Sequence, residues 1–561
     1  RFCQKWRRRC IPTPEGGGIR AETVVSAAIR MLRRIAGILA GWDLAILTAL
    51  YSLFVFTDRV PVPGLLAICL LWLARWWATG RFTLITPMTL PILLILLMVP
   101  VSLYASADLP LSLSRVCGLA FSIAVFYTVV DRLHTLQDAW LAEGALVLMG
   151  LGMALVGLVG MDWSRGKLFA LPQLLLPQLV QGMNQAIRGR LDANSMGGTL
   201  VLFIPLLASL LWTNREATAI RSPDDDWRLR IWRRWRTPVV FLALLLVAAT
   251  LVLTRSRSAH LGAVVGLWTL AVCCGRRWLC LIPVVALAFL AIVLTGRLES
   301  FMELMLQMDV ASGNVRVGMK GRLELWQRAL YMTQDFPYTG IGIGTFNSVV
   351  HVLYPLFLIG PDSLVTHAHT ELLQVAVDMG IPGLVAYVAL LSAFGIAAWR
   401  TYQVLPHRPG IRALIVGLVC GMLAHQVFGI TDAFLLGTEP SAVIWVFLGV
   451  MTGLYLSRDR MAREGGKGKG DDGGGKEEDG KGKAENGGGM AGRLSVRRRL
   501  GDFLLAFAYW ILFSLLAIAF IGNRPHVGLA IALAGGIVLG FLSVAPLQPR
   551  RDSEQVPQEP A

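Results

Sequence analysis

The chain has 561 residues, of which 55% are hydrophobic and 16% are charged, and its formal net charge at pH 7 is +16. Its mean hydropathy is +0.60. Too few polar side chains are present to cover the surface of an ordinary soluble globular protein. The composition therefore excludes a soluble fold and indicates that a lipid bilayer solvates most of the chain.

The positive charge does not indicate a nucleic-acid partner. Its densest run, residues 228–236, borders an apolar segment, where membrane topology and attraction to anionic lipid account for it. We therefore expect membrane lipids and no nucleic acid as partners.

Residues 1–30 are basic and contain no apolar signal-peptide core, so they are predicted to be a disordered N-terminal tail. Apolar windows of the length that crosses a bilayer, roughly 20 residues, then recur along the chain. The windows lie near residues 35–56, 63–78, 84–104, 111–130, 140–161, 197–212, 239–253, 261–274, 279–294, 381–399, 413–430 and 442–456. They predict about 12 core transmembrane helices, the first nine within residues 31–296 and the other three within residues 376–457.

Two segments follow this core. Residues 458–500 are rich in Gly, Lys, Asp and Glu, which cannot bury a core, so they are predicted to form a solvated cytoplasmic linker. Residues 501–546 contain a further apolar pair near 503–521 and 527–544, and residues 547–561 read as a disordered tail. The predicted fold is an all-α polytopic membrane protein whose core carries a C-terminal appendage of two transmembrane helices.

The orientation follows from the basic residues, because short loops rich in Lys and Arg stay in the cytoplasm. With both termini in the cytoplasm, the basic clusters near residues 75–81, 228–236, 276–277, 408–412 and 458–463 all lie on the cytoplasmic side. Three segments on the external side carry arginine against this bias. They are residues 162–195, residues 255–260 and the large external loop between core spans 9 and 10, residues 297–375.

Two other patterns do not predict a site. Asp224, Asp225 and Asp226 resemble a metal-binding cluster, but they lie in the basic cytoplasmic loop and are interpreted as a solvated charge run. The eight cysteines lie in or beside apolar windows or in the N-terminal tail and indicate neither a disulfide framework nor a zinc site. We therefore predict no metal ion and no cofactor.

The large external loop contains a series of motifs. Leu323, Trp326 and Leu330 are at helical spacing before Pro337, which predicts a short amphipathic helix. The glycines at 340, 342 and 344 lack a surrounding βαβ unit and are interpreted as a tight turn. The segment His367-Ala368-His369-Thr370 follows.

This series resembles the signature of the bacterial O-antigen ligase and polymerase family. The family pattern is His, then Asn, Ser or Gln, nine residues, Gly, two residues, and Gly, Thr or Tyr. His369, Gly380 and Gly383 match it, whereas Thr370 departs from the usual amide or serine. Residues 254–262 are similar to the family's Ser-Arg-Gly-Ala motif and align Arg257 with its arginine. Residues 190–194 resemble the Arg and Asn that precede another external span start.

The resemblance implies a glycosyltransferase of the bacterial cytoplasmic (inner) membrane that uses a glycan linked to undecaprenyl diphosphate and acts at the outer face. Arginine is always charged and its planar fork suits phosphate oxygens, while a histidine near neutral pKa can remove the proton of an acceptor hydroxyl. The candidate catalytic residues are His369, Arg257 and Arg190. The candidate substrate-binding residues are Arg255, Arg322, Asn194, His367 and Thr370.

Several alternatives stay open at this point. Asn194 suits a helix cap as well as a substrate contact, and His367 suits a hydrogen bond within the loop. The acceptor is a lipid anchor in a ligase, a second lipid-linked repeat unit in a polymerase, and Ser or Thr in a protein O-oligosaccharyltransferase. A non-enzymatic transporter of lipid-linked sugars is also multispanning, but it places essential charges near the membrane midplane.

Overall fold

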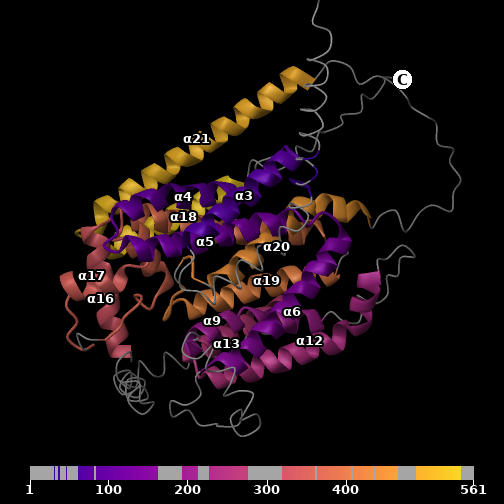
Figure 1. The fold of residues 1–561 in the computed structure, drawn as a ribbon, viewed down its shortest axis with the longest axis horizontal. Coiled ribbons are helices and arrows are strands. Elements are labelled where there is room, and N and C mark those ends of the chain that lie inside the picture. Colours follow the sequence, from indigo (N-terminus) through magenta and orange to yellow (C-terminus); the bar gives the residue numbers. More distant parts are fainter. Residues whose placement is uncertain are drawn as a thin grey trace, which may run out of the picture. The chain divides into compact units, whose positions relative to one another are not determined.

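The computed structural model describes residues 61–80, 84–161, 192–212, 227–275, 319–359, 363–405, 409–434, 436–438, 440–464 and 488–544, with isolated positions before residue 61. All regular elements in these residues are helices (Figure 1). The chain divides into two compact units, Arg1–Leu84 and Ile85–Ala561. The first unit contains the apolar helix α3 (Pro61–Thr79).

The second unit contains the other helices. Their bounds are α4 (Thr89–Tyr104), α5 (Leu109–Val130), α6 (Leu136–Gly160), α9 (Ala193–Leu200), α10 (Phe203–Trp212), α12 (Trp227–Thr254), α13 (Arg257–Cys274), α16 (Met319–Asp335), α17 (Phe346–Leu353), α18 (Glu371–Val404), α19 (Pro409–Phe428), α20 (Ser441–Glu464), α21 (Gly488–Ile521) and α22 (Pro525–Val544).

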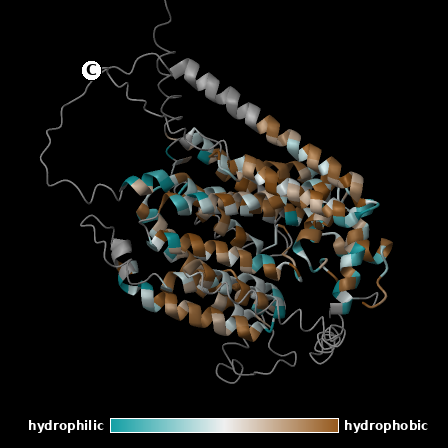
Figure 2. Ribbon diagram, turned by 180° about the vertical axis from the view of Figure 1, so that it is seen from behind, coloured by the Kyte–Doolittle hydropathy of each residue, from teal (hydrophilic) through white to brown (hydrophobic). Residues whose placement is uncertain are grey.

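The helices confirm an all-α polytopic membrane protein. Within the described residues, 10 helices are long and apolar enough to cross a bilayer. Figure 2 shows hydrophobic residues along these helices and hydrophilic residues toward their ends. The expected span at 279–294 and most of the one at 35–56 lie outside the described residues, so the total of about 12 core spans stays a prediction.

Two expected segments differ in detail from the observed helices. The window at 197–212 divides into α9 and α10 at a turn of two residues, Val201 and Leu202. Helix α20 continues to Glu464, and α21 begins at Gly488, so helical structure enters both ends of residues 458–500. Charged residues continue a helix beyond the bilayer without cost, because water solvates them there. An apolar window therefore marks the span and not the whole helix.

Helix α18 is broken at a glycine, and the break receives the external loop. Gly380 has φ of 69°, in the left-handed region that favours glycine. Ile381 N donates to Pro337 O at 2.8 Å, and Ile341 N donates to Val377 O at 2.8 Å. A Cβ added at Gly380 would lie 2.7 Å from the Pro337 carbonyl oxygen. The Gly-x-x-Gly motif therefore marks the place where the loop docks into the helix.

The two C-terminal helices pack directly on α18. Trp510 Nε1 donates to Pro382 O at 3.0 Å, just beyond the break in α18. At the other end of α18, Arg400 Nη1 donates to Val544 O at 3.2 Å. Gly536 and Gly540 of α22 face α18 so closely that an added Cβ would lie 2.5 Å from a side chain of that helix. Small residues allow such close approach of membrane helices.

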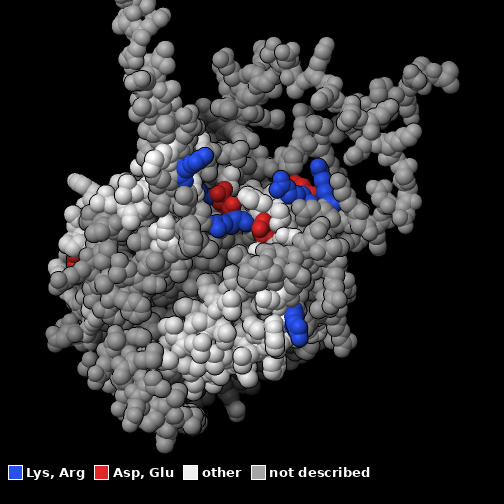
Figure 3. All heavy atoms as spheres, turned by 45° about the vertical axis from the view of Figure 1, so that its right-hand side comes forward, with Lys and Arg blue, Asp and Glu red and all other residues white. Residues whose placement is uncertain are grey.

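The ends of the helices differ in charge. The starts of α9 and α18, the end of α19 and the α12–α13 junction meet at one end of the bundle through the contacts described below. The opposite helix ends carry the basic residues, among them Arg236, Arg400, Arg412 and Arg458. Arg236 is buried and its Nε lies 2.5 Å from Glu143 Oε1. Figure 3 shows a broad uncharged area on the described part of one face, as a lipid-facing surface requires.

Candidate functional site

Helix α16 begins the part of the external loop that the structure describes, and it confirms the predicted helix ahead of Pro337. Its buried face differs from the expected one. Leu325, Ala329 and Met332 are fully buried, whereas Leu323 is 47% exposed. Phe346 of α17 belongs to the same hydrophobic cluster, so this part of the loop has a small core of its own.

The glycine-rich turn that follows is tight, as predicted. Gly340, Gly342 and Gly344 all have positive φ, which glycine adopts at little cost. Ser102 Oγ accepts from Ile343 N at 2.9 Å, and Ser112 Oγ donates to Ile343 O at 2.7 Å. Hydrogen bonds from the α4 and α5 regions therefore hold the turn against the bundle.

The carboxylate of Glu324 on α16 fixes the next stretch of loop. It accepts hydrogen bonds from the backbone N–H groups of Phe357, Leu358 and Ile359 at 2.6, 3.0 and 3.2 Å. Because the carboxylate is buried and satisfied by three donors, it stabilises one loop conformation.

Two histidines lie at the end of this loop, just before α18. The Ala368 N–H between them donates to Gln374 Oε1 at 2.7 Å, and Trp326 Nε1 donates to His369 O at 3.2 Å. His369 has φ of 51°, which is uncommon for a residue with a side chain. The imidazole rings of His367 and His369 are packed edge to face with centroids 4.3 Å apart.

Asp432, in the loop after α19, joins these histidines. His369 Nδ1 lies 3.3 Å from Asp432 Oδ1, and His367 Nε2 lies 3.6 Å from the same oxygen. The Asn194 side-chain amide donates to Asp432 Oδ2. The N-cap of α9 is Asp192, so Asn194 is not the helix cap. Sequence reasoning missed Asp432, because nothing in its local sequence distinguishes it from another loop carboxylate.

The hydrogen bonds assign different roles to the two rings. His367 Nδ1 accepts from the His369 backbone N–H at 3.2 Å, so His367 is neutral with its proton on Nε2, facing Asp432. Burial lowers the pKa of His367 to about 4. The positive charges of Arg322 and Arg115, and that of His369 whenever it is protonated, act in the same direction, against the negative charge of Asp432. His367 therefore stays neutral near pH 7.

His369 has the arrangement of a general base. Burial raises the pKa of Asp432, but the hydrogen bond from His369 and the neighbouring positive charges outweigh burial, so its pKa lies below its usual value. Asp432 is therefore ionised and accepts the Nδ1–H of His369. The lone pair of His369 is then on Nε2, which makes no hydrogen bond to any residue that the structure describes. A carboxylate that orients an imidazole in this way prepares it to accept a proton.

A buried polar network lies next to the histidines. The Glu371 N–H donates to Gly429 O at 2.8 Å, and the Tyr387 hydroxyl donates to the Glu371 carboxylate. His425 Nε2 lies 3.5 Å from Glu371 Oε2, while its Nδ1 lies 2.9 Å from Gly198 O. These contacts tie the ends of α9, α18 and α19 together, and so they position both His369 and Asp432.

Residues 242–388 match the O-antigen ligase family model. No curated protein matches the chain. The matched segment carries six of the candidate residues, namely Arg255, Arg257, Arg322, His367, His369 and Thr370. With the membrane helices, the match shows an O-antigen ligase-like membrane protein and indicates glycosyl transfer of the ligase or polymerase type. Asn194 and Asp432 lie outside the O-antigen ligase segment.

The structure brings several of the predicted residues together. Arg322 lies one helical turn before Trp326 on α16, and its charge acts on both His367 and Asp432. Its Nε is buried and makes no hydrogen bond within the described residues. Thr370 is the N-cap of α18 but makes no capping hydrogen bond with its side chain.

The other predicted arginines are placed differently. Arg255, with φ of 54°, and Arg257 are exposed at the junction of α12 and α13. This junction packs on α9, because a Cβ added at Gly197 would lie 2.9 Å from Ser256 Cβ. The junction is therefore near Asn194, one turn earlier on α9. Arg190 lies outside the described residues.

The histidines and the carboxylate also have the donor set of a metal site. The ligand atoms of His367, His369 and Asp432 lie within 4.8 Å of one another. Two imidazoles and a carboxylate suit zinc. The positive charges of Arg322 and Arg115 nearby disfavour a cation and favour an anion at this place. Metal independence therefore remains our prediction and is tested below.

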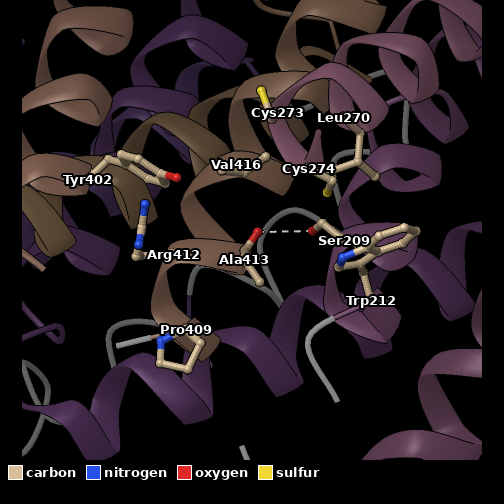
Figure 4. Close-up of a pocket in the computed structure, with 10 residues that line it drawn as sticks. All are labelled: Ser209, Trp212, Leu270, Cys273, Cys274, Tyr402, Pro409, Arg412, Ala413 and Val416. Carbon is tan, nitrogen blue, oxygen red and sulfur yellow. Dashed lines mark hydrogen bonds between the residues drawn. The ribbon is translucent and has the colours of Figure 1, made fainter. Parts of the chain in front are cut away.

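A cavity of about 190 Å³ lies far from this site. It is lined by the ends of α10 and α13, the end of α18 and the start of α19 (Figure 4). Arg412 lies 4.0 Å above the ring of Tyr402 there. The histidines lie at the opposite ends of these helices from the cavity. Each helical residue between the two regions adds about 1.5 Å to their separation. The cavity takes no part in the chemistry at His369.

Proposed function

We propose that the protein transfers a glycan from undecaprenyl diphosphate to an acceptor hydroxyl at the outer face of the bacterial cytoplasmic membrane, in the manner of an O-antigen ligase. The observation that carries this proposal is the His369–Asp432 pair. It leaves His369 Nε2 available as a base beside Arg322, in a segment that matches the O-antigen ligase family.

The reaction requires a proton acceptor and a stabilised leaving group. As the acceptor hydroxyl attacks the anomeric carbon, its proton passes to His369 Nε2, and Asp432 stabilises the imidazolium that forms. The bond between the anomeric carbon and the diphosphate oxygen breaks, and the electron pair leaves with undecaprenyl diphosphate. A single displacement of this kind inverts the anomeric configuration. A positioned base contributes about 100- to 10,000-fold to such a step.

Arginines neutralise the diphosphate in this mechanism. Arg322 is next to the histidines, and the resemblance to the family assigns Arg257 and Arg190 to the same task. A guanidinium is always charged and binds two phosphate oxygens at once. The negative charge that develops on the leaving diphosphate is thus stabilised without a metal ion.

The sidedness of the site follows from the charge bias. The basic helix ends carry Arg236, Arg400 and Arg412, and the histidines are at the opposite ends. Because basic loops remain in the cytoplasm, the site faces outward and both termini are cytoplasmic in our proposal. Its position at helix ends, not at the membrane midplane, favours an enzyme over a transporter.

The test uses the purified protein in nanodiscs with a glycan linked to undecaprenyl diphosphate. Three acceptors are offered separately: a lipid-anchored core oligosaccharide, a second lipid-linked repeat unit, and a peptide containing Ser and Thr. Transfer to the first supports a ligase, and transfer to the second or third identifies a polymerase or a protein O-glycosylating enzyme. No transfer to any acceptor refutes the proposal.

Variants test the two chemical roles. His369→Ala is expected to slow transfer by about 100- to 10,000-fold while donor binding is retained. Arg257→Lys keeps a charge but loses the planar fork, so a large loss of turnover is expected. His134→Ala is the control, because His134 is exposed at the far end of α5. If His369→Ala abolishes donor binding while Arg257→Lys retains normal turnover, the assignment of roles is wrong.

A further inference from the structure

Arg115 of α5 lies against the glycine-rich turn of the site. Ser112, three residues earlier on the same helix, donates to Ile343 O in that turn at 2.7 Å. A Cβ added at Gly344 would lie 3.0 Å from Arg115 Cγ and 3.5 Å from its Nε. The side chain therefore extends across Gly344, and the absence of a side chain at that position makes room for it.

A short chain of hydrogen bonds leads from this turn to the histidines. The Gly344 N–H donates to Asp378 Oδ1 at 3.2 Å, and Gln374 Nε2 donates to the same oxygen at 2.8 Å. Gln374 Oε1 accepts from the N–H of Ala368 at 2.7 Å, between the two histidines. The charge of Arg115 reaches His367. Arg115 is therefore close to the histidines, although it is more than 200 residues earlier in the chain.

The guanidinium of Arg115 is only partly buried, and one of its N–H groups has no acceptor within the described residues. Its Nε is buried without a hydrogen-bond partner, and the Nε of Arg322 is in the same state. None of the described carboxylates forms an ion pair with Arg115. A buried N–H group without an acceptor is costly. Two such groups beside one pair of histidines are explained when an anionic ligand supplies the missing acceptors.

We infer that Arg115 is a further substrate-binding residue, which binds the diphosphate of the glycan donor together with Arg322. This inference rests on the proposed function for the identity of the ligand. The two guanidiniums come from different helices, α5 and α16, so each can bind oxygens that the other does not reach. Arg115 lies outside the O-antigen ligase segment, and the charge bias did not single it out.

The competing explanation is structural. The charge of Arg115 also acts on the buried carboxylate of Asp378, so the guanidinium could serve the fold alone. The two roles differ in what they require. A charge near Asp378 needs only a cation, which lysine supplies. Diphosphate binding uses the planar fork, which lysine lacks.

The experiment measures binding of inorganic pyrophosphate to the full chain in nanodiscs by calorimetry, with thermal unfolding recorded for every variant. The wild type is expected to bind pyrophosphate. Arg115→Gln and Arg322→Gln are expected to weaken binding about tenfold or more. Arg132→Gln is the matched control, an exposed arginine just beyond the other end of α5, and should leave binding unchanged.

Arg115→Lys separates ligand binding from folding. If Arg115 binds the diphosphate, this variant unfolds at the wild-type temperature but binds pyrophosphate several-fold more weakly. Wild-type pyrophosphate binding by Arg115→Lys or Arg115→Gln would overturn the inference, as would a wild type that does not bind pyrophosphate.

Failure of the inference is distinguishable from failure of the proposed function. If the protein turns over the donor but its affinity for pyrophosphate does not depend on Arg115, the inference is refuted and the proposed function stands. If pyrophosphate binding depends on Arg115 but the protein transfers no glycan, the anion site is supported and the proposed function is refuted.

Discussion

Replacing Asp432 by asparagine tests the core of the site. The carboxylate accepts from His369 and faces His367 through Oδ1, and it accepts from Asn194 through Oδ2. Asparagine has nearly the same shape and keeps one oxygen for His369. It has no negative charge, however, so the imidazolium formed in the reaction loses its counter-ion.

The size of the effect follows from the geometry. Two unit charges 3.3 Å apart, the distance between His369 Nδ1 and Asp432 Oδ1, attract by about 5 kcal/mol at an effective dielectric constant of about 20. That energy corresponds to nearly four powers of ten in rate. Asparagine retains part of the interaction as a neutral hydrogen bond, so we expect turnover to fall by about 100- to 10,000-fold.

The assay compares turnover and donor binding of Asp432→Asn with those of the wild type in nanodiscs. Donor affinity should change by less than about threefold, because the carboxylate does not contact the diphosphate in our mechanism. Asp459→Asn is the control, since Asp459 is 48% exposed and distant from the histidines. A loss of turnover below about tenfold, or a loss that merely follows weaker donor binding, would refute the proposed role of the His369–Asp432 pair.

Four further predictions concern the fold, pH, topology and metal. Gly380→Ala forces a residue with a side chain to adopt a positive φ and places its Cβ against the Pro337 carbonyl oxygen. The protein should therefore unfold at a clearly lower temperature, and backbone strain alone should lower the free energy of unfolding by about 1–2 kcal/mol. Gly395→Ala in the same helix meets nothing within 4 Å, and a comparable loss there would contradict this reasoning. Because the pKa of His367 is lowered to about 4 in the folded protein, below its ordinary value of about 6.5, the unfolded chain binds more protons between these values. Stability should therefore fall by about 3 kcal/mol as pH decreases from 6.5 to 4, and His367→Gln should flatten that thermal-stability profile; an unchanged profile would show that His367 is not buried as neutral imidazole. In intact cells, an impermeant thiol reagent should label His369→Cys and not Arg234→Cys, and the reverse pattern would invert the proposed topology. Turnover should survive EDTA, whereas loss with rescue by a divalent cation would show that the two histidines and the carboxylate hold a metal ion.

The sequence alone determined the features that depend on local pattern. Apolar windows located most of the described membrane helices, and the spacing before Pro337 located α16. The positive φ of Gly340, Gly342 and Gly344 agrees with the predicted turn. His369 was found through a motif of fixed spacing and Arg322 through the resemblance to the same family, and the matched segment, residues 242–388, contains both of them. Each of these signals is local, because hydropathy, helical period and glycine conformation are properties of neighbouring residues.

Tertiary structure alone decided which distant residues complete the site. Asp432 is 63 residues from His369 and 238 residues from Asn194, and only the packing of α9, α18 and α19 brings the three together. Arg115 likewise reaches the site because α5 packs on the glycine-rich turn. At the break in α18 near Gly380, Pro337 and Ile341 of the external loop satisfy the backbone groups of Ile381 and Val377. Such pairings leave no trace in the spacing of a single sequence, since the energy of a buried charge or a free backbone group depends on which partner the fold places beside it.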